Sequence, residues 1–168
     1  LSISGAMFQQ FSHGLIMSIM FMSAGAIQTS TGTRIINNLG GLAKKMPMLA
    51  VLMMLGFMAS LGLPGLTGFI AEFLVLAFSY VNLPGFVLLA LLSIVITAGY
   101  NLWAMQRAMF GVYSEKFGDV RDIDSLQVFS MGIIALLVLY FGLNPNPVLN
   151  MMITNSEAIV SLAAALGV

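Results

Sequence analysis

The chain has 168 residues, of which 60% are hydrophobic and only 7% carry a charge, and its formal net charge is zero. Because a soluble domain averages about 25% charged residues, this composition predicts an integral membrane protein, and the neutral balance argues against a nucleic-acid partner. The sequence has no cysteine and one histidine. It offers no ligand set for an iron–sulfur cluster or a zinc ion, so we expect no cofactor and no metal site in this chain.

Four apolar segments follow one another along the chain, and each is long enough to cross a hydrocarbon core about 30 Å thick. They cover about residues 5–28, 47–80, 86–111 and 126–143. Residues 144–168 form a tail with a proline-marked turn and a mildly apolar stretch, which is compatible with an interfacial helix. We therefore predict an all-α membrane protein with four transmembrane segments in a single transmembrane region, 1–168. Because the first residue is Leu1 and lies in an apolar run, we expect a fragment of a longer chain.

The second segment is too long for one straight membrane helix. A helix over 47–80 would extend about 51 Å at about 1.5 Å per residue. Leu63, Pro64 and Gly65 lie in its middle, where proline removes a backbone donor and clashes with the preceding turn. We predict a helix broken near 63–66, with halves over about 47–62 and 67–80. Non-helical backbone within a membrane must be buried in protein or line a hydrated cavity, so this segment should not face lipid.

The basic residues fall in only two of the connections. Residues 29–46 and 107–125 contain all six of them: Arg34, Lys44, Lys45, Arg107, Lys116 and Arg121. The turn over 81–85 has none. Two predicted crossings separate the basic connections, which places both on one side, and the positive-inside rule makes that side cytoplasmic.

Glu72 is the only acidic residue within a predicted span. A charge near the middle of a bilayer costs at least about 2.5–3.5 kcal/mol on insertion scales, so such a residue suggests a function by default. A carboxyl group in a partly hydrated break can take up and release protons. The structural alternative is a protonated Glu72 that forms a hydrogen bond to a neighbouring helix. We favour a proton site.

His13 is the second ionisable residue within a predicted span. Counted from the outer ends of their segments, His13 and Glu72 both lie eight residues in, or about 12 Å deep at about 1.5 Å per residue. Equal depth would permit a proton relay if the two helices are neighbours. Gln9 and Gln10 precede His13 by four and three residues and share its side of the helix. The structural alternative is a neutral histidine held by a hydroxyl or a carbonyl group.

A polar stripe runs along the third segment, where Ser93, Thr97 and Asn101 recur every four residues and therefore share one helix face. Such a stripe can support ordered water in a polar relay. It can equally supply hydrogen bonds between helices. The sequence leaves both interpretations open.

Five stretches of the sequence carry a family resemblance: "FSHGLIMSIMFMSAG", "NNLGGLAKKMPMLA", "MASLGLPGLTGFIAEFLVL", "QRAMFG" and "FGLNPNPVLN". Together they resemble the antiporter-like membrane subunits of respiratory complex I. Within that family they look most similar to the M type, which is equivalent to chain 4 of the mitochondrial enzyme. The resemblance covers nearly the whole chain and corresponds to the final third of a larger antiporter-like helix bundle.

The resemblance implies roles for individual residues. It makes 5–28 the eleventh helix of the family, with His13 as a histidine of the proton pathway, and 47–80 the broken twelfth helix. Glu72 matches the acid that distinguishes M-type subunits, where related L- and N-type subunits carry lysine. The input-side glutamate and two central lysines of the family lie in earlier helices. The resemblance therefore implies the outward proton-exit half of a proton-pumping subunit.

At the level of the whole assembly, the resemblance implies a subunit of an enzyme, a proton-translocating quinone oxidoreductase, with no redox centre in this chain. The donor in such complexes is NAD(P)H, ferredoxin or a reduced deazaflavin. Quinone, flavin and iron–sulfur clusters are expected in partner subunits, and neighbouring antiporter-like subunits in a prokaryotic cell membrane are the expected partners. Two alternatives remain: a subunit of a multi-subunit cation/proton antiporter, and a non-conducting membrane scaffold.

Overall fold

The computed structural model describes residues 1–166, and all regular secondary structure within that range is helical. Three short 3₁₀ helices lie in the connections, over Ile36–Asn38, Leu42–Lys44 and Glu115–Phe117. The six α-helices are α1 (Ser2–Thr31), α2 (Pro47–Ser60), α3 (Thr67–Tyr80), α4 (Pro84–Met109), α5 (Ser125–Leu143) and α6 (Asn146–Ala165). The all-α prediction is confirmed.

Three of these helices, α1, α4 and α5, are long and apolar enough to cross a membrane. The helices α2 and α3 are apolar but have only fourteen residues each. Fourteen residues rise about 21 Å, which is less than a hydrocarbon core of about 30 Å, so neither of them spans a membrane by itself.

Local sequence explains where several helices begin and end. Both α2 and α4 start at a proline, which is favoured at the first helical position because its missing N–H would have no partner there. For this reason α4 begins at Pro84, two residues before the predicted segment. α1 ends at Gly32, which adopts a left-handed conformation with φ 75°. Asp124 begins α5 with a capping box that pairs it with Gln127.

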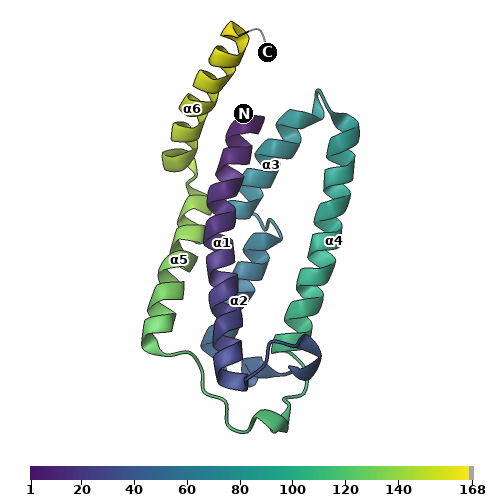
Figure 1. Ribbon diagram of the computed structural model, residues 1–168, viewed down its shortest axis with the longest axis vertical. Coiled ribbons are helices and arrows are strands. Elements are labelled where there is room, and N and C mark those ends of the chain that lie inside the picture. Colours follow the sequence, from purple (N-terminus) through teal and green to yellow (C-terminus); the bar gives the residue numbers. More distant parts are fainter. Residues whose placement is uncertain (167–168) are drawn as a thin grey trace.

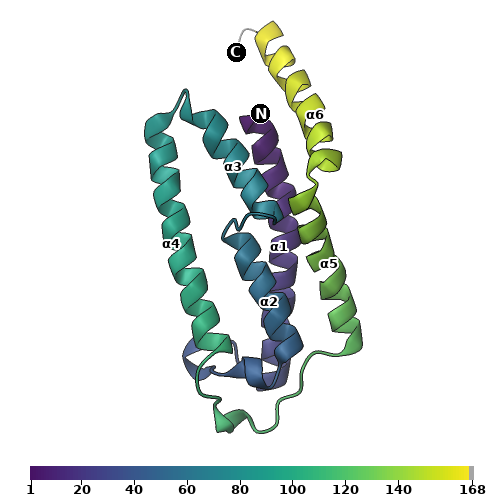
Figure 2. The same ribbon diagram turned by 180° about the vertical axis from the view of Figure 1, so that it is seen from behind.

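α1 lies at the centre of the bundle and packs against α2, α3, α5 and α6 (Figure 1). Seen from behind, α2 and α3 meet at an irregular connection, with α4 on one side and α5 on the other (Figure 2). The fully buried side chains Phe8 and Ile19 of α1, Leu49 of α2 and Val138 of α5 form part of the apolar interior. α4 is mostly exposed and meets α2 and α3 along one edge.

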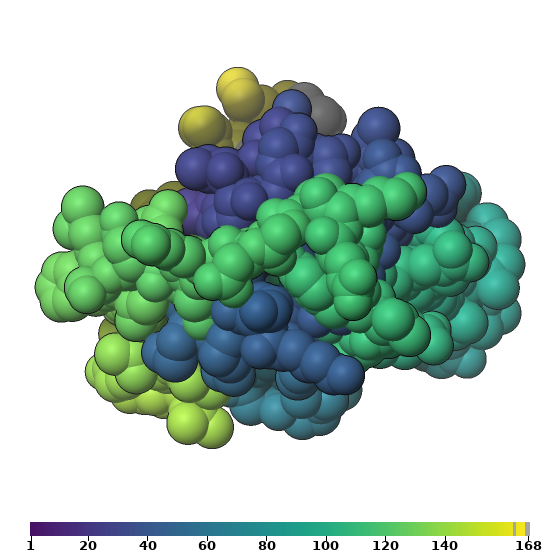
Figure 3. All heavy atoms as spheres, turned by 90° about the horizontal axis from the view of Figure 1, so that it is seen from below, coloured from purple at the N-terminus to yellow at the C-terminus, as the bar shows by residue number. Residues whose placement is uncertain are grey.

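The two basic connections lie side by side at one end of the molecule, which we call the basic end (Figure 3). The Gly41 N–H donates to the Phe110 carbonyl oxygen at 3.0 Å. Asp122 accepts hydrogen bonds from the first turn of α2, from Met48 N at 2.7 Å and from Leu49 N at 3.2 Å. The connection between α4 and α5 thus caps the start of α2.

The predicted tail contains α6, which lies at the opposite end of the molecule and packs against α1 (Figure 1). A hydrogen bond of 2.9 Å joins the buried hydroxyl groups of Ser4 in α1 and Ser156 in α6. The last two residues of the predicted tail, 167–168, lie outside the described residues.

Candidate functional site

Residues 61–66 form a non-helical connection between α2 and α3. Hydrogen bonds from Leu63 N to the Met58 carbonyl oxygen and from Leu66 N to the Leu63 carbonyl oxygen, both 3.1 Å, hold the connection compact. Pro64 provides no N–H, and Leu66 provides no side-chain cap for the N-terminus of α3. The predicted position of the interruption, at Leu63, Pro64 and Gly65, therefore coincides with a non-helical segment in the structure.

The interruption is not fully enclosed by the described residues. Leu66 is buried, but Leu63 and Pro64 lie at the surface, where they border a shallow groove beside α5. Within residues 1–166, the interruption therefore has one exposed face.

The Glu72 side chain folds back from α3 onto the interruption. Gly62 has φ 67°, a left-handed conformation that L residues rarely adopt, and a Cβ atom at this position would lie 2.5 Å from the Glu72 Oε2 atom. The carboxyl group therefore occupies space that only glycine leaves free.

Glu72 lines a groove of about 400 Å³ between α3 and α4. Its polar lining side chains are Glu72 and Tyr80; the others are Leu61, Phe69, Phe73, Leu76, Ala77, Val87, Leu91 and Ile94, with Gly62 at the base. Within residues 1–166, no hydrogen bond or ion pair engages the Glu72 carboxyl group. A partly buried carboxyl group without a fixed partner is suited to exchange protons with water or with a mobile donor.

The structure offsets His13 from Glu72 along the bundle. The Ser12 hydroxyl donates to Thr67 Oγ1 at 2.9 Å, and a Cβ atom at Gly5 would contact Leu74. The two helices therefore run antiparallel, and the residue numbers of facing positions in α1 and α3 add up to the same value. Glu72 is therefore level with about residue 7 of α1. His13 lies about 9 Å from that level, given a rise of about 1.5 Å per residue. This register corrects the equal depth obtained by counting from segment ends, because the helices do not end at matching positions.

Gln9 lies at a height between His13 and Glu72. Its Oε1 atom is buried and has no hydrogen-bond partner among the described residues, whereas Gln10 and His13 are exposed. Because buried acceptors are nearly always satisfied, this oxygen calls for a water molecule or a donor from elsewhere. Gln9, unlike Gln10, is thus placed to take part in a chain of hydrogen bonds.

The polar stripe of α4 divides into two parts. The Ser93 hydroxyl donates to the Ala90 carbonyl oxygen at 2.7 Å, and the Thr97 hydroxyl donates to the Ser93 carbonyl oxygen at 2.9 Å, so both bond to their own helix. Asn101 alone reaches another helix, where its Nδ2 donates to the Ser60 hydroxyl oxygen at 3.3 Å.

Three buried or half-buried hydroxyl groups near the interruption, those of Ser12, Ser60 and Thr67, were not predicted as site residues. Ser12 and Thr67 are fully buried and bond to each other, and Ser60 is the last residue of α2. A polar residue directly beside a predicted break, as Ser60 and Thr67 are, is the signal that could have identified two of them. Among the described residues, no cluster of three or more metal-ligating side chains occurs.

Comparison with known proteins places the chain in a family. Residues 1–97 match the sequence profile described as NADH:quinone oxidoreductase/Mrp antiporter, TM. That match covers more than half of the chain, so the chain belongs to this family of membrane proteins. With three helices long and apolar enough to cross a membrane, it is a multi-pass integral membrane protein.

Individual relatives narrow the class to M-type subunits, as the sequence predicted. The chain is 83% identical over all 168 residues to the F(420)H(2) dehydrogenase subunit M of Methanosarcina mazei, and it covers 34% of that protein. It is 37% identical over 160 residues, or 94% of its length, to the NADH-quinone oxidoreductase subunit M of Rickettsia felis, of which it covers 32%. The chain thus spans about a third of the length of these relatives.

Two solved structures share the fold. Respiratory complex I from Thermus thermophilus contains a chain that matches with a TM-score of 0.79 and 31% identity, over 89% of this chain and 32% of that chain. The Mrp complex from Dietzia sp. matches with a TM-score of 0.80 but only 17% identity, over 89% of this chain and 36% of that chain. The second likeness shows the fold alone.

Proposed function

We propose that this chain is part of the M-type proton-pumping subunit of a complex-I-like oxidoreductase, in which it forms the outward proton-exit half of the channel. The observation that carries the proposal is the 83% identity, over the full chain, to an F(420)H(2) dehydrogenase subunit M. That relative also favours a reduced deazaflavin as the electron donor of the assembly, ahead of NAD(P)H or ferredoxin.

In this proposal α2 and α3 together make one broken membrane crossing, which gives the chain four crossings with α1, α4 and α5. Two helices of about 21 Å joined end to end are long enough for a core of about 30 Å, and each alone is too short. The interruption at 61–66 then lies within the membrane. The face that Leu63 and Pro64 expose requires cover from another part of the subunit or assembly.

The basic end faces the cytoplasm of a prokaryotic cell in this arrangement. Support comes from the six Lys and Arg residues, which the sequence confines to 29–46 and 107–125. Basic residues in short loops are retained on the cytoplasmic side of membranes. The turn after α3, the start of α1 and α6 then lie toward the outer side. The groove that contains Glu72 extends in that direction as far as Tyr80, the last residue of α3.

Glu72 is the proton-exchanging group of this proposal. Its carboxyl group is unpaired among the described residues and lies in the groove between α3 and α4. His13 supplies protons through Gln9, whose unpartnered Oε1 atom lies between the two in height. The offset of about 9 Å along the bundle means that water must complete the path. Gln10, Ser93 and Thr97 are secondary members of this polar relay.

The chain itself performs no electron transfer in this scheme. Quinone, flavin and iron–sulfur clusters belong to partner subunits, and neighbouring antiporter-like subunits transmit the energy of electron transfer. Changes in the charge or position of groups near Glu72 alter its proton affinity, and the proton leaves toward the outer side.

Replacing Glu72 with Gln in the complete complex tests the proposal, because the amide keeps the shape and cannot exchange a proton. We expect normal assembly, but strongly reduced proton uptake into inverted vesicles and reduced coupled electron transfer. Glu157→Gln, the same change on the exposed surface of α6, is the matched control and should leave both rates unchanged. Undiminished pumping by an assembled Glu72→Gln complex would contradict the proposal and favour a scaffold.

The second candidate is a subunit of a cation/proton antiporter, and the fold shared with the Mrp complex is the observation in its favour. The two candidates differ in their partners. Purification of the native assembly should recover peripheral redox subunits if the leading proposal is correct. Sodium-dependent transport by an assembly that lacks such subunits would support the antiporter.

A further inference from the structure

The contact between Asn101 and Ser60 is the only side-chain hydrogen bond that joins α4 to α2 within the described part of the chain. The Asn101 side chain is buried, with 7% of its surface exposed. Ser60 ends α2 and lies two residues before Gly62, which contacts the Glu72 carboxyl group. This bond therefore sits directly below the proposed proton site, on the side of the basic end.

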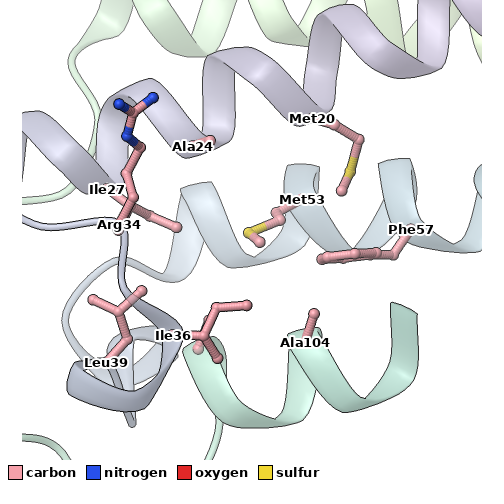
Figure 4. A pocket seen from close by; sticks show the side chains of 10 residues that line it. Met20, Ala24, Ile27, Arg34, Ile36, Leu39, Met53, Phe57 and Ala104 are labelled. Atoms are coloured by element: carbon pink, nitrogen blue, oxygen red, sulfur yellow. The ribbon is translucent and has the colours of Figure 1, made fainter. Parts of the chain in front are cut away.

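Two grooves lie along the same edge of α4, one on each side of this bond. Toward the basic end is a groove of about 220 Å³, bordered by Phe57 and Ala104. Figure 4 shows its apolar wall, with Met20 from α1 and Met53 from α2, while the Arg34 guanidinium group points away from Met53. Toward the opposite end is the groove that contains Glu72.

The order of residues places the bond between the two grooves along α2 and α4. On α2 and the residues after it, Phe57 lines the first groove and Leu61 lines the second, with Ser60 between them. On α4, Ala104 lines the first groove and Ile94 the second, with Asn101 between them. Along α4, Asn101 thus lies between the residues that border the two grooves.

An asparagine is suited to closing such a passage. Its amide does not titrate near neutral pH, and its bond to Ser60 holds the side chain across the gap. Apart from Arg34, the side chains that line the groove on the basic side are apolar and offer water no hydrogen-bond partners, so they do not favour a filled channel there. A closure at this point would direct the protons of Glu72 to one side.

We propose that the Asn101–Ser60 pair closes the Glu72 groove toward the basic end, so that Glu72 exchanges protons only with the opposite side of the membrane. The inference rests on the proposed function of Glu72, and it assigns Asn101 a positioning and sealing role instead of a place in a relay. The two roles make different predictions for substitutions of different size.

Substitutions of Asn101 in the complete complex separate sealing from relay. Asn101→Ala removes the side chain and should join the two grooves, which raises the passive proton leak of liposomes that contain the complex several-fold in the absence of donor. Asn101→Leu keeps a similar shape without polar atoms and should retain low leak and most of the pumping. Ser130→Ala, which removes a hydroxyl group that bonds within its own helix α5, is the matched control and should not leak. Loss of pumping without leak in both Asn101 variants would overturn the proposal, because a relay fails whenever its polar atoms are removed.

Side-specific labelling gives a readout that does not depend on proton transport. A cysteine placed by Leu91→Cys, in a complex freed of other reactive cysteines, lines the Glu72 groove. A membrane-impermeant maleimide should reach it from the outer side only, and from both sides once Asn101→Ala is added. Labelling from the basic side while Asn101 is intact would overturn the closure. Because labelling does not need Glu72 to titrate, this result stays separate from the outcome for Glu72→Gln.

Discussion

The two ends of α2 are held in different ways. At the basic end, the Asp122 carboxylate accepts hydrogen bonds from Met48 N and Leu49 N, and a second carboxylate, that of Asp119, pairs with Lys45 at 3.0 Å. At the other end, α2 stops at Ser60, and the non-helical connection that follows forms no ion pair and no hydrogen bond to a carboxylate among the described residues. Carboxylates hold the fold at the basic end. At the interruption, a carboxyl group is left without a partner among the described residues.

Close packing of α5 adds to the backbone hydrogen bonds that hold the interruption. Gly142 of α5 lies directly against the carbonyl oxygen of Gly65 and the backbone of Leu66, so that α5 contacts the connection without an intervening side chain. A segment held by packing and backbone hydrogen bonds keeps its shape without an ion pair to the ionisable group beside it. Under the proposed function, this support leaves the Glu72 carboxyl group free to exchange protons.

The largest effect should follow from disturbing the packed end. At Gly142, a Cβ atom would lie 2.5 Å from the Leu66 Cα atom, so Gly142→Ala forces α5 away from the interruption. We expect a loss of about 1–3 kcal/mol, typical of overpacking, seen as a lower thermal midpoint of the purified complex. Gly132→Ala in the same helix is the control, because a Cβ atom there meets no heavy atom within 4 Å. Equal midpoints for the two variants would show that close contact at Gly142 does not hold the interruption.

A smaller effect should follow at the basic end, from removal of the cap on α2. Asp122→Ala leaves the N–H groups of Met48 and Leu49 without their acceptor, which should cost about 0.5–2 kcal/mol, the usual range for a lost N-cap. Asp122→Asn keeps an acceptor oxygen and should lose less. Amide hydrogen exchange in the first turn of α2 measures the effect locally. Unchanged protection of Met48 and Leu49 in Asp122→Ala would show that the cap is dispensable.

The all-helical character could be predicted from the sequence, because it depends on local features. Long apolar runs predicted helices over 5–28, 86–111 and 126–143, where α1, α4 and α5 lie. Pro64 and its neighbouring glycines lie in the non-helical connection between α2 and α3. The confinement of basic residues to two connections also agrees with their contact at one end, where Gly41 meets Phe110.

The sequence did not predict which residues far apart in the chain contact one another. Asp122 caps a helix that begins 75 residues earlier, and nothing local marks which N–H groups its carboxylate will meet. The register of α1 against α3 appears only in contacts between the two helices, such as the Ser12–Thr67 hydrogen bond and the close approach of Gly5 to Leu74, so counting from segment ends misplaced His13 relative to Glu72. Which way the Glu72 side chain turns depends on the open space at Gly62, a property of the packed structure.

The smallest effect should follow from breaking the ion pair of the basic end, because both of its side chains are well exposed and water screens them. The Lys45 ammonium group, by its hydrogen bond and charge, lowers the pKa of Asp119 from its ordinary 3.8, and Asp119 raises the pKa of Lys45 from 10.5. The contribution of the pair to stability is therefore complete between these two values. It is lost as the pH falls through the lowered pKa of Asp119 or rises through the raised pKa of Lys45.

Asp119→Asn should consequently shift the thermal midpoint far less than Asp122→Ala, and by the same small amount at pH 6 and pH 8. A shift as large as that of Asp122→Ala would mean that exposed charge, and not the cap, holds this end of α2.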